Sequence, residues 1–570
     1  MIERAPTTLP LRRLAGALAA AVLVAVPGVA SGQGLGFEAP RKLPNSPPGA
    51  STMQGGEPSV AFDGSGDGHV YVVAPGGSDR GINFWASADH GLTFPIAKTV
   101  GSQLGGGDSD IEVGIDHAVY AADLEVVANA VCRSHDFGKT FGDNCETNVP
   151  TNQQGPESDR EWISHDPTHA NVLYFTYHDF AGEVPIIEKS TDGGQTFSPC
   201  GSITQPGSQQ QQDFTTGGTD VGKPVIGRDG SIYVPVTEPS SPLVTGAYNN
   251  FFVAVAKGGC DGSTVFTDYV IHSDPGANLA NIFTDLAIDG GGTLYAAASG
   301  KLKAGDPGYG TYVFTSTDGG QHWASHQVNS PNLKANVLPG LAGGLARGEV
   351  AVDWYGTETS GDPNNPSDQW RYYAATSFDG GSTWSQATVT PTPFHFGDVC
   401  TQGILCSGNR NLLDFSSIAV DPSDGSVFAV FPGDPYDTPQ NQATDPAAAY
   451  VAKQISGPQL AASGAGSSPS TPPSTTHRAP CVDRRKFTFR LHHAKRAHVV
   501  AVDVFINGRR VLHKRARALT KVTLNRLPRG TFTLKIVAKQ STGSTITSVR
   551  NYRGCKKTRP RTRSHHHRRR

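Results

Sequence analysis

Short apolar segments alternate with turn residues along most of the chain. One pattern recurs, in which apolar residues lead to an Asp, a short turn follows, and a β-rich segment comes next. Alternation of apolar and polar residues favours strands, and Asp, Gly and Ser favour the turn between them. Each copy therefore predicts an antiparallel hairpin. Six copies surround Asp63, Asp116, Asp166, Asp229, Asp289 and Asp421, and a looser seventh occupies 343–352.

A second pattern, Ser-x-Asp-x-Gly-x-Thr followed by Phe or Trp, returns out of phase with the first. Its Asp can accept hydrogen bonds from its own turn, and its Gly can take positive φ. The hydroxyls can tie the two arms together, and the aromatic ring adds apolar area that pins the turn. The pattern predicts a hairpin tip that locks itself. The copies are centred on Asp89, Asp136, Asp192, Asp318 (with His322 in place of Thr) and Asp379, and a worn sixth copy lies at 260–266.

The two hairpins together make a unit of four strands, and units of about 57 residues fill 57–456. Four-stranded sheets that repeat radially are the blades of a β-propeller. The five locked turns resemble the Asp-box, or BNR, repeat of the sialidase superfamily. This resemblance implies an all-β fold with a six- or seven-bladed propeller. The last unit lacks a locked turn, so we expect a strand near Phe37–Leu43 to close the ring.

Composition agrees with this fold class and divides the chain. Gly and Pro number 67 and 40 of 570 residues and Met only 2, which excludes a coiled coil or helical bundle. The 25 Phe and 16 Tyr exclude a wholly disordered chain. The net charge of −2 conceals an asymmetry, because 481–570 holds 26 basic and 2 acidic residues. A basic module attached to an acidic body indicates an anionic partner.

The N-terminus is typical of an exported protein. Arg12 and Arg13 precede an apolar run to Val26, and small residues follow up to Ala30, so we predict a signal peptide at 1–30. The run is too short for a membrane anchor, and no later stretch is long and apolar enough to span a bilayer. The remaining predicted segments are an N-terminal segment at 31–56, the propeller at 57–456, a Pro/Ser/Thr/Gly-rich linker at 457–480, a small Ig-like β-sandwich at 481–555 and a basic disordered tail at 556–570.

Eight cysteines in an exported chain predict disulfides. Proximity favours the pairs Cys132–Cys145, Cys400–Cys406 and Cys481–Cys555, and Cys200–Cys260 would then join successive repeats, although spacing alone does not determine the connectivity. We predict no metal and no cofactor. The segment 63–68 resembles the opening of a calcium loop, but Ala74 stands where such a loop needs a bidentate Glu. A plain hairpin turn is favoured there.

The superfamily resemblance assigns the Asp of each locked turn an architectural role, on the face opposite the active site. Candidate ligand-binding residues therefore lie in the loops before the first strand and after the second strand of each unit. The first group contains Glu57, Asp108, Asp110, Glu157, Asp159, Arg160, Glu161, Trp162, Asp220, Lys223, Asp285, Arg410 and Asp414. The second contains Asp79, Arg80, Asp123, Glu125, Tyr177, His178, Asp179, Glu238, Asp353, Trp354, Tyr355, Glu358, Asp434 and Tyr436.

Carboxylates beside aromatic rings suit glycan binding, because hydroxyl groups donate to carboxylates and sugar faces stack on rings. The residues selected for this role are Glu157, Asp159, Trp162, His178, Asp179, Asp353 and Trp354.

Sialidase chemistry, if the resemblance extends to it, makes further demands. It uses three Arg to hold the substrate carboxylate, a Tyr nucleophile beside a Glu, and an Asp acid/base. The Arg residues in suitable loops are Arg80, Arg160 and Arg410; the nucleophile pair is Tyr355 with Glu358, or Tyr177 with Glu157; and the acid is Asp110 or Asp108. The Arg-Ile-Pro motif that the superfamily carries in its first blade is absent. This departure argues against a complete arginine triad.

Three functions are compatible with the sequence. The favoured one is an exported propeller that recognises a glycan or another surface ligand. The alternative is an exo-glycosidase of sialidase type, and the third is a purely structural surface protein. We expect a monomer whose basic C-terminal part contacts an anionic cell-wall polymer, although the tail could simply increase solubility. Export argues against a nucleic-acid partner.

Overall fold

The computed structural model divides the chain into two compact units, Met1–Gly466 and Ser467–Arg570. The structure describes residues 34–45, 55–77, 81–102, 105–125, 128–142, 145, 158–179, 184–204, 220–238, 248–279, 284–399, 401, 410–436, 447–460, 486–490, 498–525, 527–528, 531–541 and 545–553. The predicted signal peptide, most of the linker and the basic tail lie outside these ranges. Within them the chain forms strands and turns, and no helix is long and apolar enough to cross a membrane.

The described residues of the first unit form seven antiparallel sheets. The first contains β3 (Ser59–Phe62), β4 (Val70–Ala74), β5 (Ile82–Ser87) and β6 (Ile96–Val100), and the second β7 (Ser109–Val113), β8 (Val119–Glu125) and β9 (Ala128–Ser134). The third contains β10 (Ser158–His165), β11 (Leu173–Asp179), β12 (Val184–Ser190) and β13 (Ser198–Pro199). The fourth contains β14 (Asp220–Val221), β15 (Val225–Ile226), β16 (Ile232–Glu238), β17 (Asn250–Ala256) and β18 (Thr267–Ser273).

The remaining three sheets complete the first unit. The fifth contains β19 (Asn278–Leu279), β20 (Asp285–Ile288), β21 (Leu294–Lys301), β22 (Gly310–Ser316) and β23 (Ala324–Gln327). The sixth contains β24 (Ala335–Gly343), β25 (Val350–Thr357), β26 (Gln369–Ser377), β27 (Ser385–Thr388) and β28 (His395–Phe396). The seventh contains β1 (Gly36–Phe37), β2 (Arg41–Lys42), β29 (Ser417–Val420), β30 (Val427–Gly433) and β31 (Ala448–Ser456).

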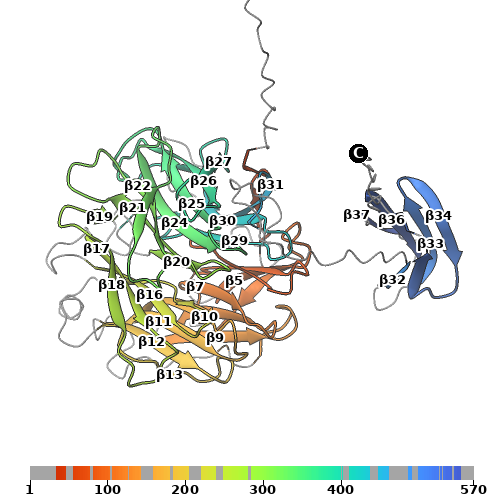
Figure 1. The fold of residues 1–570 in the computed structure, drawn as a ribbon, viewed down its shortest axis with the longest axis horizontal. Helices are drawn as coiled ribbons and strands as arrows, with labels where there is room; N and C mark the ends of the chain where they lie inside the picture. Colours follow the sequence, from red (N-terminus) through yellow and green to blue (C-terminus); the bar gives the residue numbers. More distant parts are fainter. Residues whose placement is uncertain are drawn as a thin grey trace, which may run out of the picture. The chain divides into compact units, whose positions relative to one another are not determined.

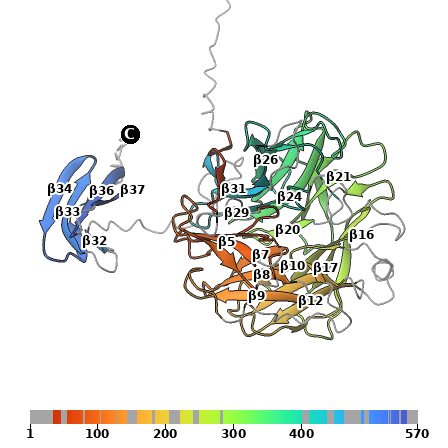
Figure 2. The ribbon, with the colours of Figure 1, turned by 180° about the vertical axis from the view of Figure 1, so that it is seen from behind.

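The sheets follow one another around a ring. Contacts run from β3 to β7, β10, β15, β20, β24 and β29, and β29 in turn contacts β3. In both Figure 1 and Figure 2, β7, β10 and β20 lie towards the middle of this unit, while β9 and β12 lie nearer its rim. Sheets that radiate from a closed ring of innermost strands have the architecture of a β-propeller.

The core lies between neighbouring sheets. The second long strand of a sheet is covered on both sides, so every residue of β16, β25 and β30 is buried. These strands are apolar runs without clear alternation, as expected where both faces of a strand are covered. Between the fifth and sixth sheets, for example, Trp354 packs with Val313 and Tyr373.

The five locked turns form as the sequence pattern predicts. In the copy at 190–196, the Ser190 hydroxyl donates to Asp192 Oδ1 at 2.8 Å and accepts from the amide of Gly194 at 2.9 Å. The other Asp192 oxygen accepts from the Thr196 hydroxyl at 2.7 Å. The same bonds recur at Asp89, Asp136 and Asp379, and His322 replaces the Thr hydroxyl at Asp318. All five turns follow the third long strand of their sheets.

Both ends of the first unit contribute to the seventh sheet. The N-terminal strands β1 and β2 pair antiparallel with β31, the last strand of the unit. They occupy the position of the strand expected near Phe37–Leu43. Because the first and last strands belong to one sheet, the ring is closed by backbone hydrogen bonds between its two ends.

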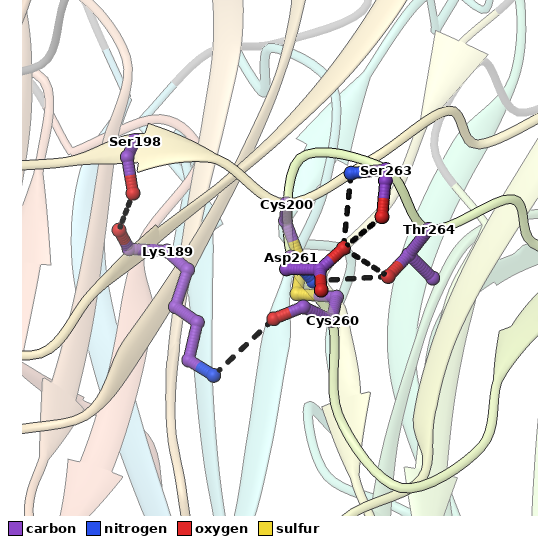
Figure 3. The surroundings of a disulfide bond; sticks show 7 residues. All are labelled: Lys189, Ser198, Cys200, Cys260, Asp261, Ser263 and Thr264. Atoms are coloured by element: carbon purple, nitrogen blue, oxygen red, sulfur yellow. Dashed lines mark hydrogen bonds between the residues drawn. A yellow bond between two sulfur atoms is a disulfide. The ribbon is translucent and has the colours of Figure 1, made fainter.

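Two disulfides lie within the described residues, Cys132–Cys145 and Cys200–Cys260. Both pairings are among the four predicted from the sequence. The second joins the end of the third sheet to the β17–β18 turn of the fourth (Figure 3). In that turn Asp261 accepts from the backbone and hydroxyl of Ser263, so the worn sixth copy retains part of the lock. The cysteines of the other two predicted pairs lie outside the described residues.

The second unit contains two small sheets within its described residues. One pairs β32 (Lys486–Arg490) with β35 (Lys521–Asn525). The other has the order β34 (Arg509–Arg515), β33 (Val499–Ile506), β36 (Thr531–Gln540) and β37 (Thr545–Arg553). Asn507 and Gly508 both have positive φ, 48° and 78°, in the two-residue turn between β33 and β34, as an Asn-Gly hairpin requires. Val502, Val522 and Leu534 belong to the core.

Candidate functional site

The innermost strands begin at one end of the ring, which we call the charged face. The locked turns lie at the other end, the locked-turn face. At the charged face, four equivalent positions just before or at the start of an innermost strand have positive φ although none is Gly. They are Glu57, Arg160, Leu338 and Leu413, with φ from 48° to 58°. Such a conformation is costly for residues other than Gly. Two of the four positions carry apolar Leu, so the conformation belongs to the architecture, whereas the charges of Glu57 and Arg160 are specific to this site.

Arg160 is at the centre of the charged cluster. Its guanidinium carbon lies 4.0 Å from the ring centroid of Trp162 and 4.0 Å from that of Phe415, and these two centroids are 5.0 Å apart, so the group lies against an adjacent pair of aromatic rings. One guanidinium nitrogen lies 3.4 Å from Asp108 Oδ2 and 3.7 Å from Glu57 Oε2. The side chain is 1% exposed. The buried Arg160 cation already contacts two carboxylates and two aromatic rings. It can therefore fix the positions of these groups from the buried side of the cluster.

A second arginine joins the cluster through Glu57. Arg410 donates to Asp414 Oδ2 at 3.0 Å, and the backbone amide of Asp414 donates to Glu57 Oε1 at 2.9 Å. Arg410 is 29% exposed and Asp108 is 24% exposed, whereas Glu57 is 1% exposed. The groups that reach solvent are therefore a carboxylate and a guanidinium already paired with a carboxylate.

Burial, together with the excess of carboxyl groups over cations, raises the pKa values of three carboxyl groups in this cluster. Burial raises the pKa of Glu57, the Asp108 carboxylate raises it further, and Arg160 opposes both. Burial likewise raises the pKa of Asp414, against the effect of Arg410. Burial and Asp108 also raise the pKa of Glu161. The cluster can therefore hold protons at a higher pH than isolated carboxyl groups and can both donate and accept hydrogen bonds.

Asp110 lies deeper and ties the innermost strands together. Its Oδ1 accepts from the Ser59 hydroxyl at 2.5 Å, and its Oδ2 accepts from the amide of Ile163 at 2.9 Å. Lys223 contributes an ion pair at 3.0 Å. The carboxylate is fully buried and links β3, β7, β10 and the segment before β15. These contacts fit a positioning residue better than the acid that the sequence analysis assigned.

A cavity of about 470 Å³ occupies the middle of the ring below the cluster. Trp162 and Phe415 line it and also stack on Arg160, so the two rings separate the cavity from the charged cluster. Glu112 lies on its wall, 3.2 Å from His165 and 3.6 Å from Lys223. Burial alone would raise the pKa of Glu112, but Lys223 and His165 lower it to about 2.

The structure does not bring the proposed nucleophile pair together. The Tyr355 hydroxyl donates to the carbonyl of Pro432, and Glu358 accepts from Asn332 at the surface. Burial raises the pKa of Tyr355, and Asp434 raises it further. A phenolate nucleophile needs the opposite shift, so this geometry disagrees with the role assigned to Tyr355.

Other predicted site residues lie elsewhere or outside the described residues. Trp354 is buried between two sheets, 5.8 Å from the ring of Tyr373. Asp353 is buried beneath the cluster and accepts from the amide of Gly340 at 3.0 Å. His178 is buried on β11. Arg80, Glu157 and the side chains of Asp159 and Asp179 are outside the described residues, and so is the alternative Tyr177–Glu157 pair.

The structure therefore brings together two of the three selected arginines and one of the two selected tryptophans. Four carboxyl residues that were among the predicted loop candidates join them, namely Glu57, Asp108, Glu161 and Asp414, which share with Arg160 a position before or near the start of an innermost strand. Their position relative to the innermost strands was the sequence feature by which these carboxyl residues could be identified. Phe415 had no such signal, because a single Phe next to a strand is most simply interpreted as core.

Comparisons with known proteins give distant structural likenesses only. No protein-family model matches the chain, and no curated protein sequence matches it. Among solved structures, the chain resembles a protein of unknown function from Dyadobacter fermentans, with 11% identity, a TM-score of 0.40, and coverage of 74% of this chain and 99% of that one. It also resembles a Hadza microbial sialidase, with 12% identity, a TM-score of 0.37, and coverage of 66% and 74%. A xyloglucanase from Xanthomonas campestris shows 16% identity, a TM-score of 0.39, and coverage of 71% and 55%. Likenesses at this level say nothing of the activity of this chain.

Proposed function

We propose that the chain is an exported β-propeller that binds an uncharged glycan at its charged face. The observation that carries this proposal is the engagement of Arg160 by Glu57 and Asp108. A clamp for a sugar carboxylate needs guanidinium groups directed at the ligand. Here the carboxylates that surround Arg160 are the available partners, and they suit the hydroxyl groups of a neutral sugar.

The test compares neutral with sialylated oligosaccharides on a glycan array, followed by calorimetric titration of the best ligand. Asp108→Asn should weaken binding of the neutral ligand about 10- to 100-fold, because a hydrogen bond to a charged acceptor is worth about 1.5–3 kcal/mol. Asp116→Asn is the matched control, since Asp116 is an exposed carboxylate in a turn at the locked-turn face. Preferential binding of sialylated ligands, lost in Arg410→Ala, would overturn the proposal in favour of an arginine clamp.

Glycoside hydrolysis is the second candidate function, and one observation favours it. Burial raises the pKa of Glu57, and the neighbouring carboxyl group of Asp108 raises it further. A protonated carboxyl beside an ionised one is the pairing that carboxylate-based glycosidases use. Hydrolysis of neutral aryl glycosides that disappears in Glu57→Gln would establish an enzyme. The absence of turnover, at protein concentrations where a contaminant would be detected, leaves the binding function.

The architecture and location form part of the same proposal. We propose that the seven sheets are seven blades, supported by the closed order of contacts among their innermost strands. The two disulfides and the signal-like N-terminus support export. An experimental structure of the mature protein, together with N-terminal sequencing of the secreted form, tests both points. An unprocessed N-terminus or a six-bladed ring would contradict them.

The second unit is proposed to be an Ig-like domain that contacts an anionic surface polymer. Its edge strand β34 exposes Arg509, Arg510, Lys514 and Arg515. Attraction between such a strand and a polyanion is screened by salt. Retention on an immobilised anionic polymer at low salt, lost at about 1 M salt and reduced by Arg509→Ser/Lys514→Ser, is the expected result. Retention that is insensitive to both salt and substitution would refute it.

A further inference from the structure

The first hairpin of most sheets turns on an Asp at the locked-turn face, and two of these Asp residues show how the carboxylate is normally satisfied. Asp421 accepts from the amide of Ser423 at one oxygen, and its other oxygen lies 2.8 Å from the Lys453 ammonium. Asp289 accepts backbone amides at one oxygen and the Tyr295 hydroxyl, at 3.0 Å, at the other. In both turns each carboxylate oxygen has a partner.

The first sheet departs from this arrangement. Asp63 Oδ1 lies 2.8 Å from the amide of Ser65 and 2.8 Å from His117 Nδ1. Its Oδ2 is buried and has no hydrogen-bond partner among the described residues. Tyr71, which corresponds to Tyr295, is also fully buried, and its hydroxyl likewise has no partner in the described part of the chain. The bond that joins these two groups in the fifth sheet is thus missing in the first.

Two further side chains near Asp63 offer atoms that could bind a metal ion. Asp67 and His69 each offer an atom that lies within 4.8 Å of a carboxylate oxygen of Asp63 and of each other. His69 Nδ1 lies 2.7 Å from Asp67 Oδ1. The His69 ring stacks on Phe137 at a centroid distance of 4.2 Å, which fixes the orientation of the imidazole.

The charge of Asp63 also has no Lys or Arg beside it among the described residues, and the basic side chain that pairs with it there is His117. Burying a carboxylate without a counter-charge is costly. Lys453 supplies the positive charge at Asp421, whereas no Lys or Arg within the described ranges forms an ion pair with Asp63.

We propose that Asp63, Asp67 and His69 bind a divalent transition-metal cation, for which Zn²⁺ is the representative. Asp63 would bind the cation through its unpartnered Oδ2. His117 would not bind the cation but would hold Oδ1 by a hydrogen bond, as partners of metal-ligating side chains commonly do. Two carboxylates and an imidazole form a donor set suited to Zn²⁺. Calcium prefers oxygen ligands and would gain nothing from His69. Because His117 lies in the turn of the second sheet, the cation would stabilise the contact between the first two sheets.

The test is calorimetric titration of the full chain with Zn²⁺. The tail contains His565, His566 and His567, which would bind Zn²⁺ by themselves. All measurements therefore use a background variant in which these three residues are Ser. We expect one Zn²⁺ per chain, an increase in the melting temperature with Zn²⁺ concentration, and no comparable effect of Ca²⁺.

Two site variants and one control make the assignment specific. Asp67→Asn and His69→Gln should each abolish binding of the single Zn²⁺ or weaken it at least about 10-fold. Asp67 is 51% exposed, so its substitution should leave the fold intact. His322→Gln is the matched control, because His322 and Asp318 form an exposed pair at the same 2.7 Å distance. Its Zn²⁺ binding should be unchanged.

Three results would overturn the proposal. One is the absence of a Zn²⁺-dependent change in melting temperature, which would mean that a buried water satisfies Asp63 and Tyr71. Another is binding of Ca²⁺ in preference to Zn²⁺, which would show that the imidazole is not a ligand. The third is Zn²⁺ binding that persists in both site variants.

Discussion

Replacing Arg160 by Met tests the centre of the charged cluster directly. Met keeps an unbranched side chain against the rings of Trp162 and Phe415 but removes the charge. Glu57 and Asp108 then lose a cation at 3.7 Å and 3.4 Å, and Glu57 remains buried. Arg and Met tolerate the positive φ of position 160 equally poorly, so the substitution should change backbone strain little.

The size of the effect follows from burial. Removing one partner of a buried ion pair costs about 3–5 kcal/mol, because the other charge is left uncompensated. The first unit extends over roughly 430 residues from Gly34 to Gly466, and unfolding entropy is about 2.1 cal/mol/K per residue. The expected decrease in melting temperature is therefore roughly 3–6 °C at neutral pH.

Differential scanning calorimetry at two pH values provides the assay. A carboxyl whose folded-state pKa is raised, such as Glu57, contributes stability below its unfolded pKa and loses it as the pH rises through the folded value. Without Arg160 that pKa rises further, so the deficit should be larger at about pH 8 than at about pH 4. Glu57→Gln added to Arg160→Met should restore part of the loss at the higher pH.

Arg371→Met is the matched control, since Arg371 donates to the Pro391 carbonyl at an exposed position. It should change the melting temperature by less than about 1 °C. The reasoning is refuted if Arg160→Met behaves like this control, or if its deficit is the same at both pH values.

Three further predictions concern the framework. Asp192→Ala removes the acceptor of the locked turn and should lower the free energy of unfolding by about 1–3 kcal/mol in urea titration; no measurable change would contradict an architectural role. Replacing Cys200 and Cys260 with Ser opens a loop of sequence separation 60 and should cost up to about 4 kcal/mol, measured in the same way against the oxidised wild type; an unchanged free energy of unfolding would contradict a stabilising role for this bond. Burial alone would lower the pKa of His395, but its hydrogen bond to Asp434 at 2.8 Å raises it. Its stabilising contribution is complete below about pH 6.5 and declines as the pH rises through the folded pKa, so His395→Gln should lower the melting temperature most at about pH 6 and least at high pH.

Much of the fold could be predicted because its signals are local. A locked turn forms within eight residues, and its Ser, Asp, Gly and Thr bond to one another in four of the five copies, while His322 takes the place of Thr in the fifth. The first hairpins are equally local, and the Asn507–Gly508 turn follows from the φ preferences of two residues. Patterns of this kind determine strands, turns and their repetition whatever the rest of the chain does.

The candidate site could be predicted only in part. Selecting residues by their place before an innermost strand correctly gathers Arg160, Arg410 and Trp162. The same reasoning selected Tyr355 and Glu358 as a pair, but it could not tell that one side chain is buried and the other exposed. Tyr355 belongs to β25, whereas Glu358 follows the end of that strand, and only the packing of the sheet shows which of the two side chains is covered.

The sequence by itself determined an all-β chain of repeated hairpins with locked turns. Only the tertiary structure decided what those hairpins assemble. Arg160 lies against Trp162 of the third sheet and Phe415, which precedes the innermost strand of the seventh, and its acidic partners precede the innermost strands of the first and second. These residues meet because closing the ring brings the innermost strands of distant repeats to one axis. The spacing of these residues along the chain does not show that the ring closes. The hydrogen bonds within a turn, by contrast, follow from the spacing of its residues alone.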